Sequence, residues 1–495
     1  MDVKHQGLAA DGVSRLDVAA VNSATARALY KAREPIFPKR VSGRFRAVKW
    51  ALLILTLGVY YGLPWLRWPR GAGEPSQAVL VDFEGGRFYF FFLEIWPQEI
   101  YFITGLLILA ALTLFLVTAL VGRVWCGYAC PQTVWTDLFI AAERFVEGDR
   151  NARIRLDRAP WTAEKITKRG AKHAIWLLIA FATGGAWILY FHDAPTIARD
   201  FFTGDAPGSA YLFAGLLTFT TYSLAGLMRE QVCTYMCPWP RIQGAMTDHE
   251  TLEVTYRRDR GEPRGAHKKG EPWDGRGDCV DCRQCVAVCP MGIDIRDGDQ
   301  LECINCALCI DACDEIMGKI GRPRGLIAYD SAVNAERRAQ KLKPRFRPLR
   351  PRTIYYAAAW LIVAGVMLAG LATRTQAELS ILRDRNPTYV VLSDGSVRNG
   401  YEVKILNKDN VARTFRLSVE AGVPLEVRVI GTGTSPDGSV ALEARPDTVS
   451  PFRVFLTAPK EARTVPSLDV TFRVESAESG ALATTKSVFQ TGSRT

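Results

Sequence analysis

Five long apolar runs constrain this chain more than any other feature of its sequence. They cover residues 48–66, 100–121, 174–191, 210–227 and 354–372. A helix of about 20 mostly apolar residues is long enough to cross a bilayer. The first run follows almost fifty mostly polar residues, so it is not a removable signal peptide. We therefore predict a polytopic α-helical membrane bundle with five spans.

Lys and Arg residues between the spans predict their orientation. Segments 1–49 and 122–172 hold ten each and segment 228–353 holds twenty-two, whereas 67–99 holds three and 192–209 holds one. Loops rich in Lys and Arg stay in the cytoplasm. We therefore expect the three basic segments to be cytoplasmic and the region after the fifth span to lie outside. The net charge of +11 then suits an anionic membrane surface, and we expect no nucleic acid partner.

All twelve cysteines fall on the predicted cytoplasmic side. Because disulfides belong to oxidising compartments, this distribution indicates metal or redox chemistry. Residues 279–290 read CVDCRQCVAVCP and residues 303–314 read CINCALCIDACD. Each run has the C-x2-C-x2-C-x3-C spacing of a bacterial two-cluster ferredoxin, in which one tight loop supplies three thiolates to a cubane. The rival interpretation, zinc, favours paired cysteines separated by a longer gap.

The fourth cysteine of each run ligates the other cluster in this arrangement. The two predicted [4Fe–4S] clusters therefore have crossed ligand sets. Cluster 1 is expected on Cys279, Cys282, Cys285 and Cys313, and cluster 2 on Cys303, Cys306, Cys309 and Cys289. Two clusters in one small insert predict an α+β ferredoxin domain that conducts electrons.

Two further cysteine pairs follow the second and fourth spans. Each reads Cys-x3-Cys-Pro with a basic residue shortly before it, which predicts a parallel internal repeat of two helical hairpins. The motifs consist of Cys126, Cys130 and Pro131, and of Cys233, Cys237 and Pro238. On a helix, residues i and i+4 share a face, so each pair is expected to present two thiols together. The prolines suit the first turn of a following helix, and 132–148 is predicted to be an amphipathic helix on the membrane surface.

Four such thiols predict a site for soft-metal or redox chemistry. Thiolates suit Cu(I), an iron–sulfur site or a redox disulfide; the alternative is that these cysteines are small apolar residues in a helix interface. Met236 is an additional candidate ligand because thioethers favour Cu(I), although packing is the commoner role of such a methionine. Glu94 and Glu99, at the outer end of the second span, leave open an ion or quinone site. Solvated acids beside anchoring aromatic residues are the more common arrangement.

From about residue 387 the pattern changes to short β-rich segments that recur every eight to twelve residues, with Gly, Pro and Asn between them. This pattern predicts an immunoglobulin-like sandwich. The chain is thus predicted to be multi-domain. Its parts are a cytoplasmic N-terminal segment, a four-helix membrane region with both CxxxCP repeats, a cytoplasmic 2[4Fe–4S] ferredoxin domain with a basic linker, a fifth transmembrane helix and a periplasmic immunoglobulin-like β-domain, over residues 1–47, 48–250, 251–353, 354–372 and 373–495.

Across nearly its whole length the chain resembles the FixG/RdxA/CcoG family of cytochrome c oxidase accessory proteins. The resemblance rests on the two CxxxCP motifs, the two ferredoxin runs, the segment GRPRGLIAYDS at 321–331 and the C-terminal β-domain. It implies a bacterial inner-membrane protein that is needed to assemble the cbb3-type oxidase. The implied activity is that of an oxidoreductase, which reduces Cu(II) to Cu(I) on the cytoplasmic side so that copper reaches the oxidase. Its implied partners are assembly factors and copper chaperones or transporters.

The residues themselves fit this function. In our hypothesis an unidentified cytoplasmic donor reduces the two [4Fe–4S] clusters, which pass single electrons to copper held by Cys126, Cys130, Cys233 and Cys237. Reduction is favoured because thiolates stabilise Cu(I) over Cu(II). Two alternatives stay open: a quinol-linked electron-transfer protein without copper chemistry, and a non-catalytic scaffold for oxidase assembly.

Overall fold

The computed structural model describes most of the chain. The described residues are 8–10, 12–22, 34–70, 74–268, 272–374, 377–408, 411–432, 439–446, 448–476, 480 and 482–492. The chain divides into two compact units, Met1–Gly365 and Val366–Thr495.

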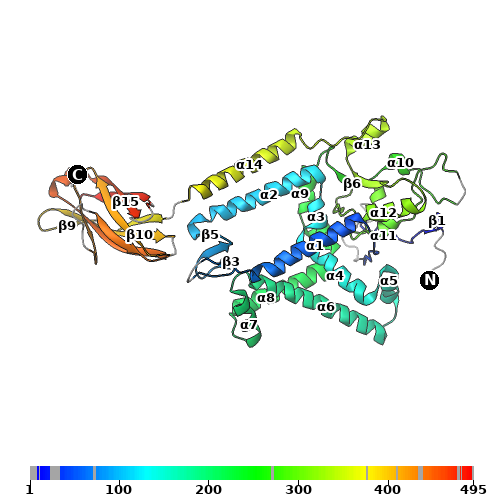
Figure 1. The fold of residues 1–495 in the computed structure, drawn as a ribbon, viewed down its shortest axis with the longest axis horizontal. Coiled ribbons are helices and arrows are strands. Elements are labelled where there is room, and N and C mark those ends of the chain that lie inside the picture. The colour runs from blue at the N-terminus through cyan, green and yellow to red at the C-terminus, as the bar shows by residue number, and fades with distance from the viewer. Residues whose placement is uncertain are drawn as a thin grey trace. The chain divides into compact units, whose positions relative to one another are not determined.

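Five helices of the described chain are long and apolar enough to cross a membrane, which confirms the predicted spans. Their surfaces expose large apolar side chains, such as Leu107 at 65%, because lipid covers them in place of protein. Helix α14 lies beside α2, where the indole N–H of Trp360 donates to Thr113 (Figure 1). The five are α1 (Arg44–Gly62), α2 (Tyr101–Val121), α6 (Ala163–Ile188), α8 (Gly208–Thr221), which continues as the π-helical segment η3 (Tyr222–Met228), and α14 (Pro351–Ala372).

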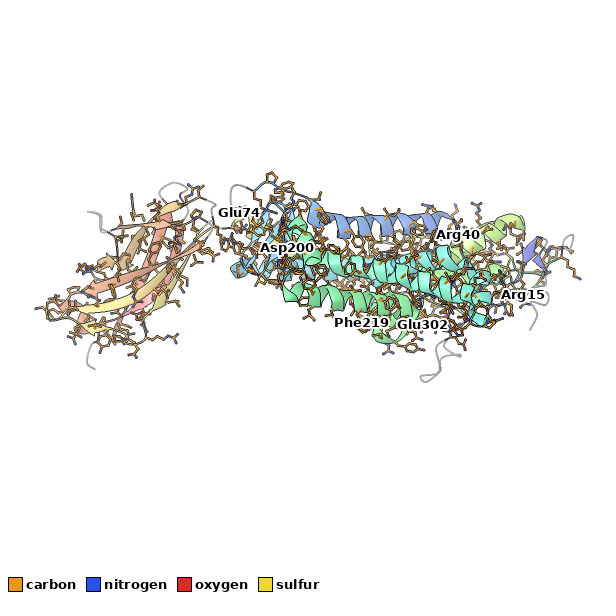
Figure 2. The ribbon with its side chains drawn as sticks, turned by 90° about the horizontal axis from the view of Figure 1, so that it is seen from below. Arg15, Arg40, Glu74, Asp200, Phe219 and Glu302 are labelled. Carbon is orange, nitrogen blue, oxygen red and sulfur yellow. The ribbon has the colours of Figure 1, made fainter. Side chains whose placement is uncertain are left out.

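Short elements close one end of the helices. They are a three-stranded sheet and a helix, formed by β3 (Val79–Asp82), β4 (Arg87–Phe90), β5 (Leu93–Ile95) and α7 (Ala194–Thr203). Figure 2 places Glu74 and Asp200 at this end, and Arg40 and Glu302 at the other. Glu99 accepts a hydrogen bond from the backbone of Trp96, and Glu94 lies 3.4 Å from Arg87. Both acids thus have structural partners here.

The opposite end carries the CxxxCP motifs and the ferredoxin domain, and we call it the ferredoxin end. Its membrane-side elements are α3 (Val124–Tyr128), α4 (Pro131–Glu147), α5 (Arg150–Arg158), the π-helical η4 (Val232–Met236) and α9 (Trp239–Met246). Helix α4 does not lie on a surface as its amphipathic pattern predicted. Its Phe139 is fully buried and accepts a hydrogen bond from Trp176 of α6, and its acidic side chains are buried as well.

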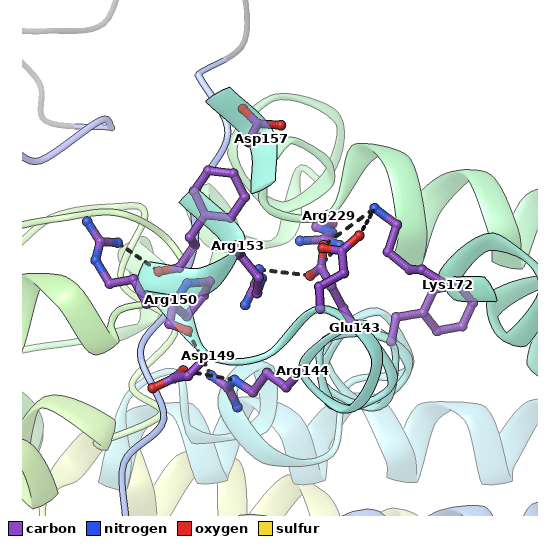
Figure 3. Close-up of polar contacts among 12 residues, drawn as sticks. Glu143, Arg144, Asp149, Arg150, Arg153, Asp157, Lys172 and Arg229 are labelled. Carbon is purple, nitrogen blue, oxygen red and sulfur yellow. Dashed lines mark hydrogen bonds and ion pairs between the residues drawn. The ribbon is translucent and has the colours of Figure 1, made fainter. Parts of the chain in front are cut away.

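Helix α4 can be buried because its acidic side chains form ion pairs with buried cations. Glu143 of α4 lies 2.8 Å from Arg153, 3.0 Å from Arg229 and 3.7 Å from Lys172 (Figure 3). Its partners come from α5, α6 and the end of η3, and Arg153 has no exposed surface. The polar face of α4 thus joins the second hairpin to the first instead of facing water.

The ferredoxin domain pairs β6 (Glu253–Tyr256) with β7 (Ile327–Asp330) and contains α11 (Gln284–Val288) and α12 (Leu308–Lys319), flanked by α10 (Arg258–Gly261) and α13 (Ala332–Ala339). The N-terminal segment packs on this domain. It forms β1 (Leu8–Ala10) and β2 (Val13–Ser14), and its backbone amides at Leu16 and Val21 donate to the carbonyls of Cys282 and Gly292. The described part of this segment, residues 8–10 and 12–22, therefore packs as part of the ferredoxin fold.

The second unit is a sandwich of two antiparallel sheets, which confirms the predicted immunoglobulin-like class. Their strand orders are β12-β14-β10-β8, with β9 beside β10, and β13-β11-β15-β16. Tyr401, Phe415, Phe472 and Phe489 fill the core between them. The strands are β8 (Ala377–Arg383), β9 (Val390–Val391), β10 (Val397–Asn407), β11 (Arg413–Ala421), β12 (Glu426–Val429), β13 (Val440–Ala444), β14 (Thr448–Ala458), β15 (Ser467–Ser476) and β16 (Leu482–Gln490).

Candidate iron–sulfur and thiol sites

The two ferredoxin runs adopt the same tight loop. Asp281 and Arg283 in the first run, and Asn305 and Ala307 at the equivalent positions of the second, all have positive φ between 49° and 58°. Residues other than glycine rarely adopt this conformation, and it persists only where the surroundings demand it. In both runs the loop bends the chain around a central space, as a cubane requires.

Each loop surrounds a small buried cavity lined by thiols. The first is lined by Cys279, Cys282, Cys285 and Cys313, and the second by Cys289, Cys303, Cys306 and Cys309, with Cys285 bordering both. Burial raises the pKa of Cys289 to about 11 and that of Cys303 to about 12, while backbone N–H groups of the loops oppose the shift. Four thiols with backbone donors beside them fit a [4Fe–4S] cluster at each cavity. The shared border puts the two cavities next to each other.

The first CxxxCP motif breaks its helix between the two cysteines. Cys126 lies in α3, whereas Cys130 has extended backbone and is the N-cap of α4, which Pro131 opens. The proline position is as predicted. The single helical face expected for the pair is wrong, because α3 ends at Tyr128.

The second motif has a different backbone. Cys233 lies in the π-helical η4, Cys237 has extended backbone after it, and Pro238 caps α9. Here too the two cysteines lie on different elements. The repeat in sequence therefore corresponds to two related but unequal turns.

Both turns nevertheless contribute to one cavity of about 310 Å³, which we call the thiol cavity. Met236 is 55% exposed and does not line it. No three His, Cys, Asp or Glu side chains of the described chain are close enough together to hold a single ion, so the thiols surround a space. The cavity is lined by Cys126, Cys130, Cys233 and Cys237 together with Leu114, Arg123, Trp125, Gln132, Thr133, Val232, Trp239, Pro240, Leu301, Glu302, Cys303 and Ile304.

Burial holds the Cys126 and Cys233 thiols of this cavity in their protonated form. Burial raises the pKa of Cys126 to about 12, with Cys130 and Cys233 adding to the shift and Arg123 opposing it. Burial likewise raises the pKa of Cys233 to about 12. The Cys126 thiol donates to the side-chain oxygen of the fully buried Gln243, at 3.1 Å. A soft metal that binds here has to displace these protons.

Gly127, between the cysteines of the first motif, packs directly against the loop of cluster 2. A Cβ on Gly127 would lie 2.6 Å from the carbonyl oxygen of Ile304 and 2.9 Å from the Cα of Cys306. Next to it, the buried Tyr128 donates its hydroxyl to the carbonyl of Cys306 at 3.2 Å. Any larger residue at position 127 would force the cavity and the cluster loop apart.

Sequence reasoning missed three of these residues. Gly127 and Tyr128 stand between the cysteines of the first motif, and Gln243 lies in α9. A glycine inside the motif is the only local signal, because its contact lies about 180 residues further along the chain. The eight ferredoxin and four CxxxCP cysteines were all predicted, and the structure brings each group together.

Comparisons with known families agree with this organisation. A 4Fe–4S dicluster domain matches residues 228–332, and a 4Fe–4S binding domain matches residues 103–146. The family described as an IG-like fold at the C-terminal of FixG matches residues 367–492. Two 4Fe–4S ferredoxin domains are therefore indicated, and the match at 103–146 covers most of α2 and the first CxxxCP motif.

Curated relatives match over most of the chain. The nitrogen fixation protein FixG of Rhizobium meliloti is 54% identical over 92% of this chain and 93% of its own. Protein RdxA of Cereibacter sphaeroides is 50% identical over 93% of this chain and 98% of its own. The crystal structure of a FixG-related protein from Vibrio parahaemolyticus aligns at 19% identity and a TM-score of 0.21, over 24% of this chain and 99% of that one. The chain belongs to the FixG/RdxA family and is a membrane-associated iron–sulfur electron-transfer protein.

Proposed function

We propose that this protein is a cupric reductase that uses electrons from its two clusters to convert Cu(II) to Cu(I) in the thiol cavity. The observation that carries the proposal is the convergence of four cysteines, from segments more than a hundred residues apart, beside Cys303 of the cluster 2 loop. The product serves the assembly of a cbb3-type oxidase, as the resemblance of the sequence implies. We further propose that the ferredoxin end faces the bacterial cytoplasm, because its connecting segments carry most of the Lys and Arg.

The chemistry requires one electron for each copper ion and no bond rearrangement in the ion itself. The clusters, when bound to their eight cysteines, supply single electrons at low potential. The four cavity thiols release protons as the ion binds, and as thiolates they favour Cu(I) over Cu(II). Gln243 orients Cys126, and Gly127 keeps the cavity in contact with the loop of cluster 2. Because the thiols enclose a space larger than one ion, the product is free to leave.

The experiment replaces Cys126, Cys130, Cys233 and Cys237 together by Ser in the full-length protein purified without oxygen. About eight irons per chain should remain, since the ferredoxin cysteines are intact. Cupric reduction by the dithionite-reduced protein should fall to the level of the buffer. Undiminished copper reduction and binding would overturn the proposal. About twelve irons in the wild-type protein would also overturn it, since a third cluster would then occupy the cavity.

A matched control tests whether thiols in general, and not this cavity, reduce the ion. The other eight cysteines of the chain are the expected cluster ligands, so the control is the cysteine-replaced protein with its two clusters reduced and free glutathione added. Because glutathione reduces Cu(II) by itself, the quantity measured is the copper-dependent reoxidation of the clusters, which glutathione should not restore to the wild-type rate. If it does, the cavity thiols have no specific role. If the protein is a scaffold without redox function, copper should not oxidise the clusters in either the wild-type or the cysteine-replaced protein.

A second candidate function is quinol oxidation, and the lining of the cavity favours it. Leu114 of α2, Trp125, Val232 and Trp239 give the cavity an apolar wall next to a membrane span. Apolar clefts with a few polar groups are typical sites for small organic ligands. This function predicts reduction of the clusters by a ubiquinol analogue without copper, at a rate that Leu114→Trp lowers.

A further inference from the structure

Arg123 stands between the thiol cavity and the loop of cluster 2. It follows α2 directly, is only 7% exposed and lines the cavity. Its guanidinium donates to the carbonyl oxygens of Gln300 at 3.4 Å and Cys303 at 3.2 Å, and also to that of Leu301. The side chain therefore fixes the segment that leads into the second ferredoxin run.

This buried cation has no carboxylate partner among the described residues. Its hydrogen bonds go to backbone carbonyls, and its Nε is buried without an acceptor. Glu253 is close enough to feel its charge, but burial and Asp299 raise the pKa of that carboxyl, so it is a poor counter-ion. Buried charges are normally paired. A cluster ligated by four thiolates is negatively charged and would lie on the other side of Cys303.

The equivalent surroundings of cluster 1 are different. Arg296 lies beside Cys285, but its guanidinium forms ion pairs of 2.6 Å with both Asp281 and Asp294. Two carboxylates thus lie against the Arg296 guanidinium, and one of them, Asp281, is shared with Arg15 and Arg283. The Arg123 guanidinium next to cluster 2 instead bonds to backbone carbonyls. In a medium of low dielectric constant, an uncompensated positive charge stabilises the more negative, reduced state of a cluster.

We propose that Arg123 is the counter-charge of cluster 2 and holds its reduction potential above that of cluster 1, so that electrons run from cluster 1 to cluster 2 and stop beside the thiol cavity. In this transfer cluster 1 loses one electron and cluster 2 gains it, and no proton or bond changes place. The direction toward the cavity rests on the proposed function. The difference between the two potentials does not, because it depends only on the charges around each cluster.

The test is an EPR-monitored redox titration of the full-length holoprotein in detergent without copper. Cys282→Ser and Cys306→Ser assign the two signals by removing cluster 1 or cluster 2. In the wild-type protein, cluster 2 should have the higher potential. Arg123→Gln should lower the potential of cluster 2 and leave cluster 1 unchanged, whereas Arg123→Lys should keep most of the wild-type value. Arg283 lies within the first run and its side chain is 33% exposed, so Arg283→Gln should leave the potential of cluster 2 unchanged.

An equal or higher potential of cluster 1 in the wild-type protein would overturn the proposal. So would an Arg123→Gln protein whose cluster 2 has its original potential. If Arg123→Gln fails to assemble cluster 2, Arg123→Lys decides: loss of the potential order in that variant would mean that the hydrogen bonds, and not the charge, set it. Failure of copper reduction with the potential order intact would overturn the proposed function alone.

Discussion

The two CxxxCP motifs are alike in sequence but have different neighbours. In the first, Gly127 and Tyr128 contact the loop of cluster 2, and Tyr128 is 6% exposed. In the second, the same positions hold Thr234 and Tyr235, and Tyr235 is 50% exposed. The residues between the two cysteines of the first motif therefore contact the loop of cluster 2, whereas the equivalent tyrosine of the second motif is half exposed.

The basic residues before the motifs differ in the same way. Arg123 faces backbone carbonyls of the cluster loop, whereas Arg229 forms an ion pair of 3.0 Å with Glu143 in the buried cluster of the membrane bundle. Two π-helical segments flank Arg229, while α2 and α3 beside Arg123 are α-helical. Under the proposed function, the repeat thus divides into an electron-transfer half around Arg123 and an anchoring half around Arg229. Variants in each half test this division.

The largest effect should come from Glu143→Ala, which removes the ion-pair partner of Arg229 in the anchoring half. This change leaves Arg153, Arg229 and Lys172 buried without their shared carboxylate, and breaking a buried pair in this way costs about 3–5 kcal/mol. The thermal midpoint of the detergent-solubilised protein should fall by many degrees. Glu164→Ala, which removes an exposed partner of Lys168, is the matched control and should change it little. Equal midpoints for the two variants would contradict an anchoring role.

Gly127→Val should have the next largest effect, on the electron-transfer half. The added side chain collides with the backbone of Ile304 and Cys306, which cannot move aside without opening the cluster loop. Overpacking of this kind costs about 1–3 kcal/mol. We expect loss of about four irons per chain, measured by iron and sulfide analysis, while Thr234→Val keeps all of them. Full iron content in Gly127→Val would show that the contact is looser than the structure indicates.

Tyr128→Phe should have a smaller effect. The change removes one buried hydrogen bond to the carbonyl of Cys306 and leaves that oxygen without this donor, at a cost of about 1 kcal/mol. Cluster 2 should become easier to lose in a chelator challenge, followed by its visible absorbance. Tyr235→Phe, on the exposed side of the repeat, is expected to match the wild type. A faster loss in Tyr235→Phe than in Tyr128→Phe would reverse the assignment of the two halves.

The last prediction concerns the stability of the wild-type protein in acid, where the expected change is the smallest. Burial alone would raise the pKa of Glu143, but the charges of Arg229, Arg153 and Lys172 outweigh it and hold that pKa below its ordinary value of 4.5. The stability that this carboxylate provides is therefore complete above pH 4.5 and is lost as the pH falls through the lower, folded-state pKa. Thermal midpoints of the wild type should be level down to about pH 4.5 and drop below it. Glu143→Gln should show a shallower drop, and an equally steep one would exclude this residue as a cause.

Much of this architecture could be predicted from the sequence because its signals are local. The five spans, the ferredoxin runs and the alternating strands of the β-unit each follow from a short pattern, and all three are confirmed. Pro131 at the start of α4 also follows from a local rule. The ferredoxin spacing carries so much information because the size of the cubane fixes the distance between its ligands.

The parts that were not predicted depend on contacts between distant segments. In the sequence, the acidic residues of α4 resemble a solvent-facing helix surface. They are buried because cations of α5, of α6 and of the position after η3 form ion pairs with Glu143. Tertiary packing likewise broke the helix between Cys126 and Cys130, where periodicity alone favoured one continuous face. The N-terminal sequence is polar and without clear periodicity, and it gave no sign that residues 12–22 pack on the ferredoxin domain.

That N-terminal segment has a consequence for how the protein is made. Leu16 is synthesised roughly 270 residues before Cys282, whose carbonyl it binds, and at about 5–20 residues per second the wait is on the order of 15–50 s. During that time four spans must enter the membrane while the segment has no binding site. This early-made segment is therefore among the later parts of its unit to fold, because it can make these hydrogen bonds only after the first cysteine run has left the ribosome.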